Sequence, residues 1–197
     1  MKVIFLDFDG VITTYYSHWN IDIEKLKLLD EIIQQTDAKI VVSSSWKHGN
    51  DNVEDFKNKI CNKRCSKNIK TQTPFEKFIS QIYDITDSNG AWRGDEVQRW
   101  VDNHKEELES YVILDDDDDF KDEQLFNFVQ TDGFEGITSR EVKLCVGILN
   151  NEKIPNPIRL NHELMTRWRN MRMGVEKNNI DILLHEYYNK FLSLRNC

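Results

Sequence analysis

Short apolar runs recur along the chain, and several of them end in polar residues that carry chemistry. The strongest runs lie at residues 3–6, 38–42, 111–114 and 126–131. An unbroken apolar run of this length suits a strand that is buried on both faces, as in a parallel sheet covered by helices. A weaker strand at residues 83–86 would lie at the edge of that sheet.

Between these runs, apolar side chains recur three and four residues apart, which is the spacing of one face of an α-helix. The first predicted helix follows Asn20, its predicted cap. Its apolar positions are Ile23, Leu26, Leu29 and Ile33. Further helices are predicted near residues 53–60, 75–82, 97–108 and 142–149. Alternating strands and helices predict an α/β fold, a three-layer sandwich around a doubly wound parallel sheet.

Length and composition describe a globular chain. The 197 residues fit one domain with a sizeable core. The composition excludes a disordered chain, because 39% of the residues are hydrophobic and 30% are charged. No apolar run approaches the roughly 20 residues of a membrane span, so no membrane partner is expected. The first strand follows Met1 directly, which leaves no room for a signal peptide. The four cysteines lack zinc-site spacing, and we expect a reduced, cytoplasmic protein.

The net charge of −8 is unevenly distributed. Residues 1–152 carry −12 and residues 153–197 carry +4. Six cations and no acid lie between Lys57 and Lys70. Such a run is usually a solvated face, and it is also suited to docking an anion.

The first apolar run leads into an acidic pair, Asp7 and Asp9, followed at once by Gly10. In open α/β sheets the ligand crevice lies outside the carboxyl ends of the strands, so these carboxylates arrive where chemistry is expected. A calcium loop of the EF-hand type is excluded, because its twelfth position needs a bidentate Glu and here holds His18.

Later elements bring further polar groups toward the same edge of the sheet. Ser43, Ser44 and Ser45 follow the second run, and five aspartates, 115–119, follow the run at 111–114. Between them, Arg93 opens a predicted helix. Along the chain, the polar groups expected at this edge of the sheet therefore follow the order carboxylates, hydroxyls, a cation and carboxylates.

Asp-Phe-Asp-Gly-Val after a hydrophobic strand resembles the first motif of the haloacid dehalogenase-like (HAD) phosphohydrolases. The other polar strand ends follow the order of the remaining HAD motifs. The runs Ser-Ser-Ser-Trp-Lys, Arg-Gly-Asp-Glu-Val-Gln-Arg-Trp and Val-Ile-Leu-Asp-Asp-Asp resemble the small HAD domains of Swiss Army knife RNA-repair proteins. The resemblance implies a Rossmannoid HAD core over residues 1–150, magnesium (Mg²⁺) as cofactor and phosphohydrolase activity.

Phosphoryl transfer through a covalent intermediate needs a nucleophile, a proton carrier, donors to the phosphate oxygens and a divalent cation. Asp7 would be the nucleophile and a magnesium ligand. Asp9 would carry the proton and also contribute to the metal site. The other expected residues are Ser43 and Arg93 in catalysis and Gly10, Ser44 and Ser45 in substrate binding.

Two assignments stay open in the sequence. Asp115 and Asp116 are the expected further metal ligands, but Asp119 competes with them within the run of five. Arg93 stands where HAD proteins usually carry a lysine, and its alternative role is that of a local helix-start residue. His104 is expected to pack on a helix face, and His18 and His48 to be exposed.

The sequence is least informative about the substrate. The spacing leaves no room for a large cap domain after the first motif, and an open site suits a phosphate on a large partner. The basic run and three aromatic residues, Tyr15, Tyr16 and Trp19, favour a nucleotide or nucleic-acid end. The alternatives are a protein or small-molecule phosphatase and a non-catalytic binding or effector module. Residues 151–197 would form a helical extension that packs on the core or mediates association, and the oligomeric state is unknown.

Overall fold

A computed structural model describes residues 1–50, 52–63, 73–89 and 92–152 of the chain, without the side chains of residues 62 and 63. The predicted helical extension and the basic residues Arg64, Lys67 and Lys70 therefore lie outside the described residues. Within the described ranges, no helix is long and apolar enough to cross a membrane.

Five parallel strands form one sheet in the order β3-β2-β1-β4-β5. The strands are β1 (Lys2–Leu6), β2 (Lys39–Val42), β3 (Ile82–Ile85), β4 (Ser110–Asp115) and β5 (Phe128–Gln130). In β1, the four residues from Val3 to Leu6 are completely buried, as their unbroken apolar run predicts.

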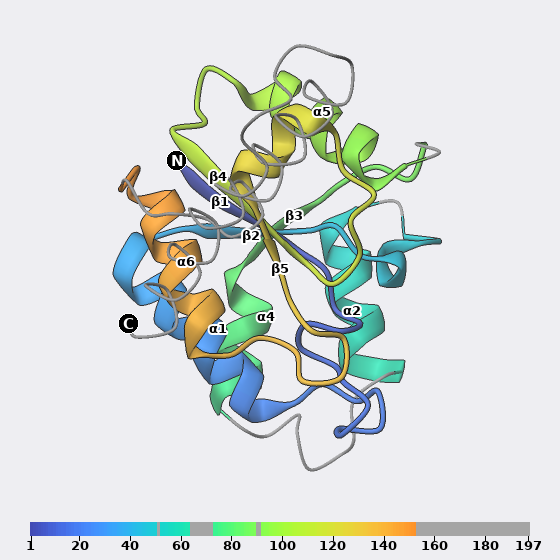
Figure 1. Ribbon diagram of the computed structural model, residues 1–197. Coiled ribbons are helices and arrows are strands. Elements are labelled where there is room, and N and C mark those ends of the chain that lie inside the picture. Colours follow the sequence, from blue (N-terminus) through green and yellow to red (C-terminus); the bar gives the residue numbers. More distant parts are fainter. Residues whose placement is uncertain (51, 64–72, 90–91, 153–197) are drawn as a thin grey trace, which may run out of the picture. The chain divides into compact units, whose positions relative to one another are not determined.

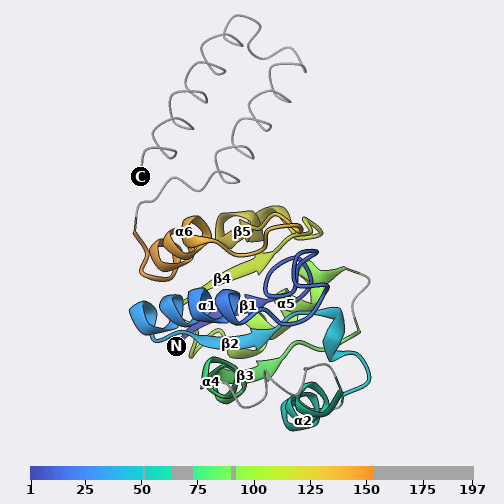
Figure 2. The same cartoon turned by 90° about the horizontal axis from the view of Figure 1, so that it is seen from below.

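Helices cover both faces of the sheet, which confirms the predicted three-layer α/β fold. Figure 1 shows α1 (Ile23–Thr36), α4 (Thr73–Gln81) and α6 (Ser139–Leu149) together on one face, and Figure 2 shows them in a row. On the other face, Trp100 of α5 (Arg93–His104) packs edge-on against Phe5 of β1, with ring centroids 5.3 Å apart.

The connections place a crevice at one point of the sheet. From β1 the chain runs outward through β2 and β3, and α5 then returns it to β4 on the other side of β1. The strand order reverses between β1 and β4, and ligands bind at such a switch point in open α/β sheets. The carboxyl ends of β1 and β4 carry Asp7 and Asp115 to this place.

The segment between β2 and β3 holds η1 (Ser45–Lys47), α2 (Val53–Lys63) and α4. The aromatic side chains of this segment anchor the turn after β1. Phe8 is fully buried, and its ring centroid lies 5.2 Å from Trp46, 5.9 Å from Phe56 and 5.7 Å from Phe78. The Phe8 carbonyl also accepts the amide N–H groups of residues 11, 12 and 13. Packing and hydrogen bonds therefore fix the backbone between Asp7 and Asp9.

The structure corrects two predictions about α1. Its cap is Asp22, whose carboxylate accepts the Glu24 amide at 2.8 Å, and not Asn20, which is exposed in the preceding turn. Both residue types can cap a helix, and the capping position lies one residue before the first helical turn. Ile32 is fully buried whereas Ile33 is only partly so, because the buried face is rotated slightly from the predicted one.

The prediction for the fifth strand is also wrong at both ends. Residues 126 and 127 belong to a short 3-10 helix, η2 (Asp122–Asn127), and β5 is only three residues long. Phe126 is 39% exposed, so the apolar run at 126–131 is not a continuous buried strand. The edge strand β3 lies one residue earlier than predicted.

Candidate active site

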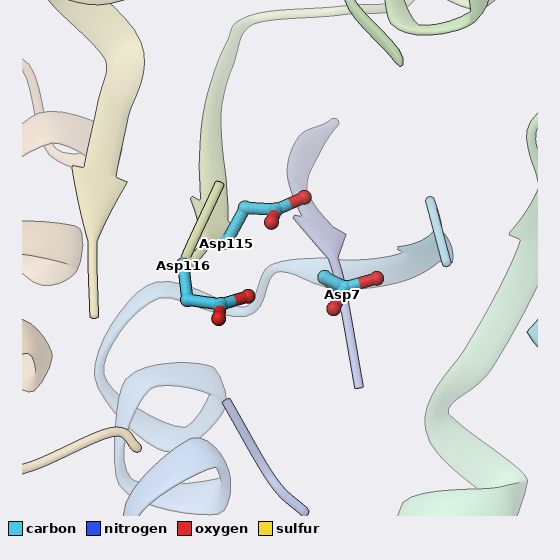
Figure 3. A group of neighbouring side chains, drawn as sticks. All are labelled: Asp7, Asp115 and Asp116. Atoms are coloured by element: carbon cyan, nitrogen blue, oxygen red, sulfur yellow. The ribbon is translucent and has the colours of Figure 1, made fainter. Parts of the chain in front are cut away.

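Three carboxylates gather at the switch point. One oxygen each of Asp7, Asp115 and Asp116 lies within 4.8 Å of the others, and Figure 3 shows the three side chains together. Asp7 is 5% exposed and Asp115 is 2% exposed, whereas Asp116 is half-buried. We call these three residues the carboxylate group.

Two glycines make room for Asp116. A Cβ atom on Gly10 would lie 2.2 Å from the Asp116 Cγ, and one on Gly133 would lie 2.6 Å from its Oδ2. Gly10 also has a φ of +73°, a conformation that residues with side chains rarely adopt. Both positions therefore need glycine for the carboxylate to reach its place. Gly10 is part of the first motif and was predicted to belong to the site, whereas no motif marks Gly133.

Arg93 extends into the site from the first turn of α5. Its Nη1 donates to the Asp7 Oδ1 at 3.0 Å and lies 3.9 Å from the Asp115 Oδ2. The guanidinium thus bridges the ends of β1 and β4, which goes beyond a local role at a helix start.

Asp119 is placed outside the carboxylate group. Its carboxylate accepts the Arg93 amide N–H at 3.2 Å, and its carbonyl accepts the Gly94 amide at 3.1 Å. Asp119 therefore holds the beginning of α5, from which the Arg93 side chain extends. Asp117 and Asp118 are exposed.

The Asp9 carboxylate is held by two neutral donors. Thr13 Oγ1 donates to Oδ1 at 2.8 Å, and the Trp46 indole Nε1 donates to Oδ2 at 2.9 Å. Both oxygens of Asp9 are thereby oriented, while Arg93 contacts Asp7 instead. The sequence analysis missed Thr13 and Trp46 as partners, because nothing in their spacing links them to Asp9.

The three serines after β2 take different positions. The Ser43 hydroxyl is buried and has no hydrogen-bond partner, which holds for no other buried side-chain polar atom among the described residues. Ser44 is also buried; its hydroxyl accepts the Trp46 amide at 3.4 Å and lies close enough to Asp7 to lower the pKa of that carboxyl. Ser45 is exposed at the first position of η1. The structure therefore brings Ser44 close to Asp7 and leaves the buried Ser43 hydroxyl without a hydrogen-bond partner in the protein.

A comparison with protein families identifies the chain. The family model described as the HAD domain in Swiss Army Knife RNA repair proteins matches residues 3–142. The chain belongs to this HAD family. The match covers β1 to the first residues of α6, so it contains every element that positions the site. Searches of curated proteins and of solved structures gave no match.

Membership in the HAD family suggests that the protein is a hydrolase acting on phosphate compounds. The residues around the switch point agree with that suggestion, because they combine a carboxylate group with one bridging guanidinium.

Two histidines of the HAD domain, His18 and His48, are exposed, and His104 stacks on Trp100 with ring centroids 3.8 Å apart. The expected packing of His104 is confirmed.

The site concentrates more negative charge than its single guanidinium offsets. Burial raises the pKa of Asp7 to about 6, against the lowering effects of Arg93 and of the Ser44 hydrogen bond. Burial and the Asp7 charge raise the pKa of Asp115 to about 9. Burial also raises the pKa of Asp116. The raised pKa values indicate that these carboxyl groups bind protons more readily than carboxyl groups in water do. A bound cation could offset their charge in the same way.

A buried ion pair supports the two elements that flank the site. Lys47, in η1, donates to the Glu96 carboxylate of α5 at 2.7 Å, and the two side chains are 1% and 7% exposed. Burial lowers the pKa of Lys47, against the raising effect of Glu96. The pair joins the segment that carries Ser43, Ser44 and Trp46 to the helix turn that carries Arg93. Both residues lie in runs that carry the family resemblance, but the pairing was not predicted, because nothing in the sequence shows that the two runs meet.

Replacing Lys47 tests how much this ion pair contributes to the free energy of unfolding. We expect Lys47→Met to lower the free energy of unfolding by about 3–5 kcal/mol, because Glu96 is left buried and unpaired. Combining it with Glu96→Leu should restore most of that loss. Urea denaturation measures both. The control is Lys57→Met, which breaks an exposed pair with Glu54 and should cost less than about 1 kcal/mol. Equal losses from the two single variants would contradict the assignment.

The raised pKa values predict how stability depends on pH in protein freed of metal by a chelator. A carboxyl with a raised pKa in the folded state keeps a proton that the unfolded state has lost, so stability falls as pH rises from about 4 to 9. Asp115→Asn should remove much of this slope and stabilise the protein at pH 8 by about 1 kcal/mol or more. Asp118→Asn, an exposed neighbour, is the matched control in thermal unfolding. A slope that Asp115→Asn leaves unchanged would contradict the prediction.

Proposed function

We propose that this HAD domain is a magnesium-dependent phosphatase that works through an aspartyl-phosphate intermediate. The observation that carries the proposal is the juxtaposition at Asp7: a guanidinium at 3.0 Å and two further carboxylates within 4.8 Å. The unpartnered Ser43 hydroxyl adds a donor with no protein acceptor. A phosphate oxygen would supply that acceptor.

The residues present fit a magnesium ion. Magnesium prefers oxygen ligands and is usually bound by one or two carboxylates together with substrate phosphate and water. Asp7, Asp115 and Asp116 would hold it, with the Asp9 backbone carbonyl as a further ligand. The bound ion would offset the charge of the carboxylate group and of the phosphate. Asp119 takes no part in this proposal, because it holds the start of α5.

Side chains from the segment after β2 and from α5 would bind the phosphate. Ser43 would donate its hydroxyl to a phosphate oxygen, and Arg93 would hold the phosphate beside Asp7. Gly10 admits the substrate and Asp116 to the same space, because it lacks a Cβ atom. Ser44 orients Asp7, so its role is broader than the substrate contact expected from the sequence. A substrate contact of the exposed Ser45 stays a prediction.

The reaction would proceed in two displacements. An Asp7 carboxylate oxygen attacks phosphorus and forms the acyl phosphate, while Asp9 gives its proton to the departing ester oxygen. A water molecule then attacks the same phosphorus, and Asp9 accepts a proton from that water. The bond between phosphorus and the Asp7 oxygen breaks, which releases inorganic phosphate and restores the Asp7 carboxylate and the protonated Asp9.

The substrate that we propose is a nucleotide or a nucleic-acid end phosphate. The family description names RNA repair proteins. Tyr15, Tyr16 and Trp19 are 58%, 76% and 52% exposed in the loop after β1, so their rings are available to a base. A protein or small-molecule phosphatase would share the chemistry and would not use these rings. A non-catalytic binding module would need neither a nucleophile nor a proton carrier.

Exchanging each acid for its amide tests the mechanism. Asp7→Asn should abolish magnesium-dependent hydrolysis of an aryl phosphate while leaving thermal unfolding cooperative, because an amide is a far weaker nucleophile. Asp9→Asn should slow alkyl phosphates at least tenfold more than aryl phosphates, because poor leaving groups need the proton most. Steady-state rates on both ester types measure this. Near-normal turnover by Asp7→Asn would exclude the covalent mechanism, whereas no turnover by the unmodified protein would favour a non-catalytic function.

The run of five aspartates supplies its own control for the metal site. Asp116→Asn should weaken magnesium binding about tenfold or more, as measured by calorimetry, since it removes one carboxylate ligand. Asp118→Asn removes the same charge from an exposed neighbour and should change the affinity less than twofold. If the two variants behave alike, only the general charge of the run attracts the metal.

A further inference from the structure

Two loops beside the carboxylate group expose aromatic side chains toward one another. Tyr15 and Tyr16 lie in the loop after β1, and Phe134, which is 64% exposed, lies in the loop after β5. The Tyr15 ring centroid is 5.9 Å from that of Tyr16 and 5.8 Å from that of Phe134. Exposed apolar side chains that gather in this way mark a contact surface more often than scattered ones do.

A pocket with a volume of about 540 Å³ opens at this surface. Its walls include the rings of Tyr16 and Phe134 and the carboxylates of Asp22, Asp132 and Glu135. We call it the flap pocket. It is large enough to admit a planar ring system, and its charged lining is predominantly negative.

The flap pocket adjoins the proposed catalytic site. The loop after β5 is tied to the loop after β1, because Thr131 Oγ1 donates to the Gly10 carbonyl at 2.7 Å. In the same loop, a Cβ atom on Gly133 would meet Asp116 at 2.6 Å. The two neighbours of Gly133, Asp132 and Phe134, both line the pocket. One tripeptide therefore contacts the carboxylate group at its centre and the pocket at its ends.

We propose that the flap pocket holds the base of the nucleotide whose phosphate is bound at Asp7. The inference rests on the proposed phosphatase function and names the part of the site that recognises the substrate. A base can stack on Tyr16 and Phe134, since every base has a π-face. Its amino groups can donate to the carboxylates of Asp132 and Glu135.

The charge of the pocket determines which part of a nucleotide enters it. Asp22, Asp132 and Glu135 outnumber the one cation of the lining, Lys25, so a phosphate is repelled from the pocket. The same charges accept hydrogen bonds from a neutral base. The phosphate then lies at Arg93 and Ser43, and the substrate is bound in a single direction.

Two substrates that differ only in the base test this inference. We compare kcat/KM for adenosine 5′-phosphate and for ribose 5-phosphate, together with the corresponding 3′-phosphates. Phe134→Ala and Tyr16→Ala should each reduce the preference for the nucleoside phosphate roughly tenfold. Tyr83→Ala is the matched control: this ring is 40% exposed on β3, under the Lys39 ammonium, and its loss should leave the preference unchanged.

A binding measurement separates this inference from the phosphatase proposal. Adenosine, which has no phosphate, is titrated into the full chain by calorimetry at low and high salt. Its affinity should fall roughly tenfold in Phe134→Ala and vary little with salt, since no ion pair forms. If no phosphate ester is hydrolysed, the phosphatase proposal fails, and this titration still decides the inference.

Three results would overturn the base pocket while leaving the phosphatase proposal intact. One is equal kcat/KM for nucleoside and ribose phosphates in the unmodified protein. Another is an equal loss of preference in Tyr83→Ala and Phe134→Ala. The third is tighter binding of an arginine peptide than of adenosine, which would make the acidic, aromatic pocket a site for cations.

Discussion

The concentration of carboxylates at one end of the sheet is the constraint on which the other features depend. Asp7 and Asp115 are nearly inaccessible to water, and Asp116 lies beside them. Three acids this close repel one another, and burial raises the pKa of each. Such a group is a poor way to stabilise a fold. Its location at the switch point of the sheet is an argument for a role in chemistry.

Neighbouring elements are arranged around that charge. Arg93 extends into the group from the first turn of α5, and Asp119 fixes the beginning of the same helix. The Lys47–Glu96 pair ties α5 to the segment after β2. The ends of β1, β2 and β4 are thereby linked through one helix turn. An ion pair buried this deeply is weak evidence for stability, and here its location suggests a positioning role.

The sequence was most informative where local pattern and function coincide. Val3 to Leu6 predicted a buried parallel strand, and the polar residues after three strands predicted where a site would form. The strand is confirmed, and the residues after the strands lie at one edge of the sheet because parallel strands place their carboxyl ends there. Contacts between distant segments left no such signal. Gly133 beside Asp116, and Trp46 beside Asp9, depend on packing that no spacing encodes.

The resemblance to a family identified the motifs in their order along the chain. It did not show which of the five aspartates would be the metal ligands. The choice depends on the turn after β4, where the Asp117 amide donates to the Asp115 carboxylate and the chain then passes the beginning of α5 on its way to η2. Asp119 is used there to accept helix amides, so it is not part of the carboxylate group. Side-chain direction within a run of identical residues is set by backbone geometry. Sequence alone therefore left this assignment open.

Asp7 and Asp9 show how two identical side chains can be given different tasks. Asp7 is buried against a guanidinium, a permanent cation that favours its charged form. Asp9 receives only neutral donors, a hydroxyl and an indole N–H, and is less deeply buried. These two donors orient the Asp9 carboxyl group without placing a cation beside it. Asp7, whose pKa burial raises to about 6 against the effect of Arg93, lies within the carboxylate group, whereas Asp9 lies outside that group. The difference between the two environments, more than the motif itself, supports the division of roles proposed for the pair.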